Sequence, residues 1–370
     1  MKVAPKYYKP ILGNLSAKND AKYWNKAVEY YEKGRLRDTL HNIINYCDPY
    51  ALKRFRDSDQ IAIPHGSTVL NVAIREGYIQ IIAPFVRLGD GNMTPLLRQI
   101  NEINFSVLTT SQIQLHNNEL FFYYQTPMEA CEPSKIYDVF HEICIQADYY
   151  DDIFVEELGA ERFREPEVRH FSKGQQKTLW KDFNDIIKEL DAYIDYLRDE
   201  RSFAVALDAA VMTLMKLDCV LAPQGKLRSD IEKQISSGLQ KGQLSDAEKL
   251  TEIMDALHKL RSEYDEARFQ KAMYIPSFFI SVRTPVALAR VQEILRNDYT
   301  NAEKEIAHDR FVSGFYYLAF GIYNLLYRYS PPVKVEEALN HALKKVSGKK
   351  WPEAARNLHG FVQKVMLMTK

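Results

Sequence analysis

The spacing of apolar and polar residues divides this chain into two parts. Between residues 60 and 125 the two kinds of residue alternate, as at Leu70, Val72 and Ile74. This period of two is typical of β-strands that bury one face. From residue 173 onward, apolar residues recur every three or four positions, which is the period of an α-helix that buries one side. The pattern therefore predicts an α+β protein whose second part is wholly helical.

The alternating region reads as two hairpins. Glu76 and Gly77 mark a tight turn, and Asn117 and Asn118 mark another, because Gly and Asn tolerate positive φ. Pro84 cannot donate to a strand ladder, so the end of its strand is predicted at an edge or a bulge. We expect essentially all strands to form one antiparallel sheet. The strands are predicted at residues 68–74, 78–85, 112–115 and 120–125.

Helical spacing, caps and breaks predict the remaining elements. Residues 1–18 are expected to be a loose arm and the stretch around 165–173 a linker. Residues 278–282 are apolar enough for a short strand, but the pattern favours an extended connection. Helices in the first part are predicted at residues 20–32, 36–47, 94–103 and 134–150. Helices in the second part are predicted at residues 173–199, 202–220, 226–240, 245–273, 284–298, 300–329, 334–346 and 352–369.

Four segments of the first part carry a resemblance to a known fold. They are the strand pair around Glu76-Gly77, PLLRQINEINF at residues 95–105, IQLHNNELFFYY at 113–124, and IYDVFHEICIQAD at 136–148. In this order they resemble the class I type III secretion chaperone fold and its YbjN-type relatives. The resemblance implies an α+β chaperone-like domain over residues 1–165, with one antiparallel sheet flanked by helices. An all-helical domain over residues 171–370 follows it.

The resemblance also implies a function and an assembly. Domains of this kind typically bind other proteins rather than catalyse reactions, often as dimers that pack through the middle helix. Leu96, Leu97, Ile100 and Ile103 would then be the partner-binding residues of a homodimer. This chain departs from the pattern in two ways, because secretion chaperones are small and usually acidic. Here the formal net charge is zero over 370 residues.

Composition narrows the class of protein. With 46% hydrophobic and 26% charged residues, the chain has the balance of a folded globular protein, and its zero net charge gives no general attraction to nucleic acid or membrane. Residues 330–370 hold eight Lys/Arg against three Asp/Glu but no nucleic-acid fold signature. The apolar stretch 311–329 is interrupted by Ser313, Asn324 and Arg328, which favours a buried core helix over a membrane span.

The four cysteines, Cys47, Cys131, Cys144 and Cys219, lie far apart in the sequence without a CxxC motif. The first residues, MKVAPKYYKPILGN, lack the apolar stretch of a secretory signal. Disulfides form mainly in oxidising compartments. We therefore expect a cytoplasmic protein with four buried free thiols.

No motif predicts catalysis, a cofactor or a metal. Glu305 and His308 have the spacing used in di-iron bundles, as have Glu167 and His170, but the two further glutamates of such a site are not evident. His65-Gly66-Ser67 places a histidine near a serine in sequence, whereas a triad is defined in space. The sequence thus favours a non-enzymatic protein-binding module. The alternative is a ligand-binding sensor or enzyme with a pocket in the helical domain, lined by the tyrosines of residues 311–329.

Charge is distributed unevenly along the chain. Residues 1–58 contain twelve Lys/Arg and six Asp/Glu, whereas residues 128–167 contain twelve Asp/Glu and three Lys/Arg. Within the acidic stretch, Asp148, Asp151 and Asp152 recur at helical spacing. They form either a solvated helix face or a docking surface for a basic partner or for the chain's own arm. The basic residues of that arm are Lys2, Lys6 and Lys9.

Overall fold

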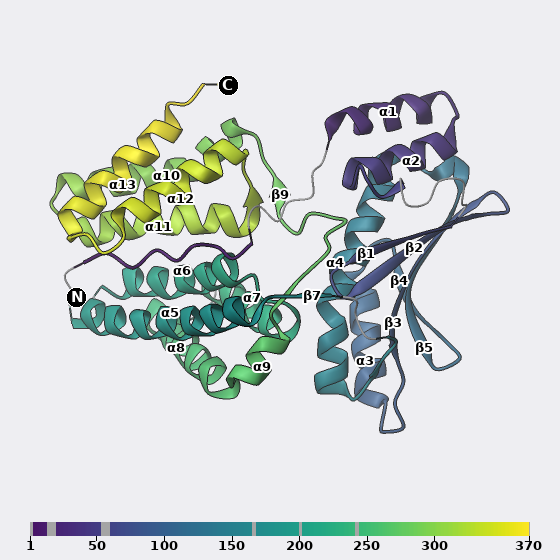
Figure 1. Cartoon of the computed structure of the whole chain (residues 1–370), viewed down its shortest axis with the longest axis horizontal. Helices are drawn as coiled ribbons and strands as arrows, with labels where there is room; N and C mark the ends of the chain where they lie inside the picture. The colour runs from purple at the N-terminus through teal and green to yellow at the C-terminus, as the bar shows by residue number, and fades with distance from the viewer. Residues whose placement is uncertain are drawn as a thin grey trace. The chain divides into compact units, whose positions relative to one another are not determined.

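The computed structural model describes residues 3–12, 20–52, 60–164, 168–199, 202–240 and 244–369. It confirms the α+β class, with an antiparallel sheet in the first part of the chain and helices after it (Figure 1). The chain forms two compact units. The sheet unit comprises residues 15–170 and 275–282, and the helical unit comprises residues 1–14, 171–274 and 283–370.

The main sheet has the strand order β1-β2-β3-β5-β4, with every pair antiparallel. The predicted strands are present, and the sheet also contains β1, which lies in the alternating region but was not among the predicted strand spans. Pro64 of β1 has no N–H to donate, which is tolerated because β1 is an edge strand. The bounds are β1 Gln60–His65, β2 Thr68–Arg75, β3 Tyr78–Arg87, β4 Gln112–His116, β5 Glu119–Pro127 and β6 Glu161–Arg162.

Local chemistry fixes the register of the hairpins. Glu76 and Gly77 connect β2 to β3 with φ of 49° and 82°, and Asn117 and Asn118 connect β4 to β5 with φ of 49° and 64°. The register of β3 against β5 shifts just after Pro84, so the predicted bulge is confirmed. Beyond this shift, β6 pairs with the end of β3.

One long helix, α4 (Pro133–Leu158), packs against β2, β3 and β5 and supplies the other half of the core. It runs eight residues further than predicted and ends at Gly159, which has a left-handed φ of 69°. Glu142 of α4 accepts hydrogen bonds from the main chain and hydroxyls of Thr109, Thr110 and Ser111, which anchors the loop before β4. The other helices are α1 Ala21–Glu32, α2 Leu36–Cys47 and α3 Thr94–Glu102, which continues as a π-helical turn, Ile103–Val107.

The helical unit follows the predicted spans with two differences. The span 245–273 is two helices, and the break between the next two helices falls at residues 308–310. None of the described helices is long and apolar enough to cross a membrane. The helices are α5 Lys173–Asp199, α6 Phe203–Leu221, α7 Gly225–Leu239, α8 Asp246–Glu263, α9 Glu266–Lys271, α10 Leu288–Ala307, α11 Phe311–Arg328, α12 Val333–Val346 and α13 Trp351–Met366. Two-residue strands occur at β7 Arg169–His170, β8 Tyr274–Ile275, β9 Thr284–Pro285 and β10 Tyr329–Ser330.

The N-terminal arm is not loose where it is described. Ala4 N donates to Lys349 O at 2.8 Å, and Ile11 N donates to Val220 O at 2.9 Å, so residues 3–12 belong to the helical unit. The hydroxyl of Tyr193 donates to Val3 O at 2.7 Å. The prediction failed because main-chain bonds hold the arm, and such bonds leave no periodic pattern in the sequence.

A second segment also belongs to a different unit from its neighbours in sequence. Residues 275–282 lie between two stretches of the helical unit in sequence, yet they belong to the sheet unit. They form a connection without helix that bends at residues 279, 280 and 282, so the predicted extended conformation is wrong there. Phe279 and Ile280 are only 1% exposed and form part of the core of the sheet unit. The predicted domain boundaries at 1–165 and 171–370 therefore need two changes. Residues 1–14 belong to the helical unit, and residues 275–282 belong to the sheet unit.

All four cysteines are free, as predicted. Cys47, Cys131 and Cys144 are buried in the sheet unit, and Cys219 is partly buried in the helical unit. Burial raises the pKa of the Cys131 thiol to about 12. This thiol is therefore un-ionised near neutral pH and acts as a small apolar core residue.

We expect Ile280→Ala to destabilise the sheet unit by about 2–5 kcal/mol, because it leaves a cavity in the core. The matched control is Val282→Ala in the same segment, where the side chain is only half-buried. Trp24 is the only tryptophan of the sheet unit, so urea unfolding of a Trp180→Phe, Trp351→Phe background reports on that unit alone. Equal midpoints for the two alanine variants would contradict the core role of the segment.

Candidate binding site at the β1–β2 turn

The turn between β1 and β2 brings together residues from three distant parts of the sheet unit. The strand pairing ends at His65 and Thr68, so Gly66 and Ser67 form a two-residue turn. Helix α4 lies on one side of this turn and residues 277–280 contact it as well. We call His65, Gly66, Ser67, Asp148 and residues 277–280 the turn site.

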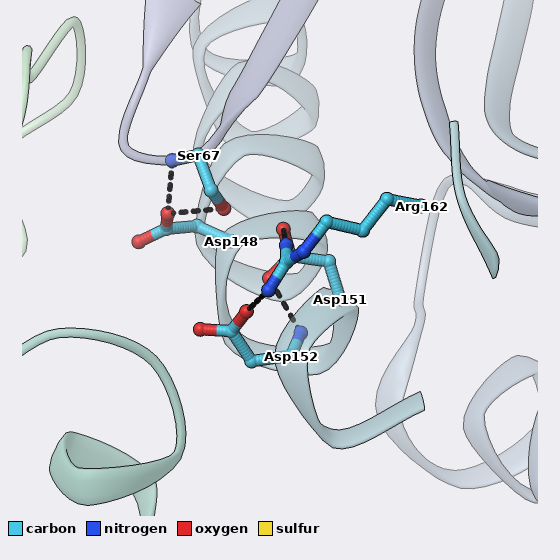
Figure 2. Close-up of polar contacts among 5 residues, drawn as sticks. All are labelled: Ser67, Asp148, Asp151, Asp152 and Arg162. Atoms are coloured by element: carbon cyan, nitrogen blue, oxygen red, sulfur yellow. Dashed lines mark hydrogen bonds and ion pairs between the residues drawn. The ribbon is translucent and has the colours of Figure 1, made fainter. Parts of the chain in front are cut away.

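Asp148 of α4 holds the turn by its carboxylate. Its Oδ1 accepts a hydrogen bond of 2.6 Å from Ser67 N and one of 3.0 Å from Ser67 Oγ (Figure 2). A Cβ atom on Gly66 would lie 1.8 Å from the same oxygen, and Gly66 has a φ of 55°. Glycine is therefore required here both by the backbone conformation and by the close approach of Asp148.

The β1–β2 turn also binds the main chain of residues 277–280. Gly66 N donates to Ser277 O at 2.9 Å. His65 Nδ1 accepts from Phe279 N at 3.2 Å and from Ile280 N at 3.3 Å. Because Nδ1 must offer its lone pair, the imidazole of His65 is neutral and carries its proton on Nε2. The side chain of His65 is fully buried, at 0% exposure, so this geometry is shielded from water.

Aromatic side chains complete the contact. The ring of Phe279 lies 5.5 Å from that of Phe140 on α4, with the planes tilted by 65°. The ring of Phe278, which is half-buried, lies 5.6 Å from the imidazole of His65. These edge-to-face arrangements are the favourable geometry for aromatic pairs. The segment is thus held by three main-chain hydrogen bonds and by apolar burial together.

A hollow of about 220 Å³ lies beside the segment. Residues after α2, the end of β1 and the segment itself line it. Pockets for drug-sized ligands usually measure about 300–1,000 Å³. This hollow is smaller and suits a single side chain. Its lining residues are Asp48, Ala51, Ile63, Pro64, Ser277, Phe278 and Phe279.

The acidic residues that follow Asp148 on α4 contact Arg162 of β6 (Figure 2). Arg162 Nη1 lies 3.5 Å from Asp151 Oδ2, and Arg162 also forms an ion pair with Asp152. Burial raises the pKa of Asp151 well above its usual value, and the neighbouring carboxylates of Asp152 and Asp148 add to the shift. A second hollow, of about 20 Å³, lies between Thr68, Asp151 and Arg162, which is room for about one water molecule.

This arrangement does not form a hydrolytic triad. Ser67 Oγ donates to Asp148, and the Nδ1 atom of His65 is occupied by the main chain of residues 279 and 280. No group of His, Cys, Asp and Glu suited to a metal ion occurs among the described residues. Glu305 pairs with Arg310 at 2.6 Å, and His308 Nδ1 lies 2.8 Å from Lys304 O. Glu167 lies outside the described residues.

The structure places the predicted partner-binding residues mostly in the core. Leu96, Ile100 and Ile103 belong to the core of the sheet unit, whereas Leu97 is 40% exposed. Only Leu97 of these four thus offers a surface, and the homodimer stays a prediction. Asp148 and Asp151 are each 8% exposed and contact groups of their own unit.

Two parts of the turn site escaped the sequence interpretation. The sequence pattern indicates His65 only as a partner for Ser67, and residues 278–282 only as a short strand or an extended connection. One signal was available: Phe278, Phe279 and Ile280 form an apolar triplet outside any predicted helix. Such a triplet in a connecting segment indicates burial against another part of the chain.

We expect Gly66→Ala to destabilise the sheet unit more than Gly77→Ala. Both glycines have positive φ in hairpin turns, so each substitution costs about 1–2 kcal/mol of backbone strain. Only at Gly66 would the new methyl group collide with Asp148, whereas nothing lies within 4 Å at Gly77. Urea denaturation measures both. If the collision is the cause, Asp148→Ala should restore part of the stability in the Gly66→Ala background but not in the Gly77→Ala background.

We expect Asp151→Asn to stabilise the sheet unit at pH 8. A carboxyl group whose pKa is raised by folding contributes stability at low pH, and this contribution is lost as the pH rises through its pKa in the folded protein. The gain should therefore shrink as the pH falls toward 4. Asp152→Asn should instead lower stability at pH 8, because it removes an ion-pair partner of Arg162. Thermal melts between pH 4 and 8 test this, and parallel behaviour of the two variants would contradict it.

Comparison with known proteins adds no further assignment to this geometry. No protein-family model matches the chain. No curated protein matches it either. The resemblance to secretion chaperones therefore stays a prediction.

Proposed function

We propose that the sheet unit is a non-enzymatic, chaperone-like protein-binding module that captures a non-helical segment of a partner protein. One observation carries this proposal. The unit already binds a non-helical segment, residues 275–282, that comes from a distant part of the chain. The resemblance of the sheet unit to secretion chaperones agrees with this role. The cytoplasmic location remains an expectation.

The turn site binds the segment partly through main-chain atoms, so other peptides can make the same hydrogen bonds. Gly66 N and His65 Nδ1 bond to main-chain atoms, which every peptide offers. Burial of side chains such as Phe279 and Ile280 then selects among peptides, in the manner of other peptide-binding sites. Burying one such side chain contributes about 1.5–3 kcal/mol. Two buried anchors and three main-chain bonds are a reasonable basis for recognition of a short segment.

The hollow beside the segment supports a peptide over a metabolite. Its volume of about 220 Å³ lies below the usual range for small-molecule pockets. Pro64 and Ser277 in its lining are exposed, so the hollow is accessible from solvent. A side chain of the partner can enter it without movement of the core.

The alternative of a pocket lined by the tyrosines of α11 receives less support. Tyr316 and Tyr323 are buried in the helical unit. The ring of Tyr316 lies 5.9 Å from Trp351 and 6.5 Å from Tyr193, so other aromatic rings surround this tyrosine. These contacts are those of packed core residues.

Selection of phage-displayed peptides on the immobilised full chain tests the proposal. We expect enrichment of apolar sequences on the wild type. Pro64→Trp should abolish the enrichment, because Pro64 is exposed on β1 and a tryptophan there would fill the hollow. Ala62→Trp is the matched control, since Ala62 is also exposed on β1 but does not line the hollow. No enrichment, or enrichment that survives Pro64→Trp, would count against the proposal.

A further inference from the structure

We infer that residues 275–282 are a tethered competitor for the partner, and that the partner carries an aromatic residue followed by an aliphatic residue in a segment that bends at these two positions. This inference rests on the proposed function and adds the chemical class of the ligand and the regulation of its binding. We call the surface of the β1–β2 turn and α4 that the segment contacts the groove. A partner that uses the same contacts has to displace the segment.

The contacts of the segment define the ligand. Positions equivalent to Phe279 and Ile280 enter the core, where both side chains are 1% exposed. Positions equivalent to Ser277 and Phe278 are exposed and half-buried, so these tolerate more variation. The main chain must present a carbonyl to Gly66 N and two successive N–H groups to His65 Nδ1. Proline is therefore excluded at the two anchor positions, because it has no N–H.

The segment has little secondary structure of its own. Ile275 belongs to β8, which pairs with β7, whereas residues 276–282 form no helix or strand. Residues up to Tyr274 and from Arg283 onward belong to the helical unit. Release therefore separates Ile275 from β7, breaks the three hydrogen bonds at the turn site, and withdraws the buried side chains of Phe279, Ile280 and Ser281 from the sheet unit.

Tethering determines by what factor the segment weakens the apparent affinity for a free peptide. A segment held by short tethers acts at an effective concentration on the order of 1 mM. A free peptide with an intrinsic Kd of about 10 µM would therefore bind the wild type about 100-fold more weakly than it binds an empty groove. A natural partner overcomes this factor by making more contacts than the segment makes, for example in the hollow beside it.

A peptide binding experiment on the full chain tests the inference. The probe is a fluorescein-labelled peptide with the sequence of residues 275–282, IPSFFISV, and the control peptide has aspartate at both anchor positions. Fluorescence anisotropy measures its affinity for the wild type and three variants that alter the segment and leave the groove intact. The variants are Val282→Ala, Phe278→Ala, and the double variant Phe279→Ala, Ile280→Ala.

We expect affinity for the probe to be equal in the wild type and Val282→Ala, several-fold higher in Phe278→Ala, and about 100-fold higher in the double variant. The control peptide should bind none of them. If the double variant does not fold by circular dichroism, Phe278→Ala still decides the question, because it removes only the half-buried ring beside His65. The probe should also raise the melting temperature of a folded double variant.

The possible failures are distinct. Equal, measurable affinity of the probe for every variant would show that the segment does not compete, and it would overturn this inference while the proposed function stands. No binding of the probe to any folded variant would overturn the inference and would also count against the sheet unit as a peptide-binding site.

Discussion

The hydrogen bonds from Ser67 to Asp148 are the contact on which the arrangement of the sheet unit depends. They fix a two-residue turn at the end of the β1–β2 hairpin against α4. The turn conformation in turn aims Gly66 N and the imidazole of His65 at residues 277–280. A buried carboxylate that accepts a main-chain and a hydroxyl hydrogen bond replaces much of its lost hydration. One side chain of α4 thus positions two strands and a segment that lies more than 200 residues from their turn in sequence.

The same helix concentrates negative charge beside this contact, which would be unfavourable on an unpartnered surface. Arg162 of β6 lies against Asp151 and Asp152, and β6 itself extends the sheet along the end of β3. The cationic side chain offsets part of the cost of burying carboxylates. Burial raises the pKa of Asp151, so its proton stays on up to a higher pH than usual. Asp148, Asp151 and Asp152 therefore contact other groups of the sheet unit. Of the five acidic residues from 148 to 157, only Glu156 and Glu157 are exposed.

The two units also depend on one another through the order of the chain. The helical unit needs residues 3–12, which precede the sheet unit, and the sheet unit needs residues 279 and 280, which are synthesised much later. Contacts between residues so distant in sequence require closure of long loops, and loop closure is slow and entropically unfavourable. A chain that ends before residue 280 therefore lacks part of the core of its sheet unit.

The sequence by itself determined the elements whose cause is local. Alternating residues specified β2 to β5, Glu76-Gly77 and Asn117-Asn118 specified two turns, Pro84 specified the bulge, and helical periodicity specified most helices. Strand β1, the bound arm and the turn site were decided only by the tertiary structure. Gly66, His65 and Phe279 follow no period, because their roles arise from partners up to 215 positions apart in sequence. Likewise, Leu96 and Ile100 share an apolar helix face with Leu97, but only packing against α4 and the sheet decided which of them reach solvent.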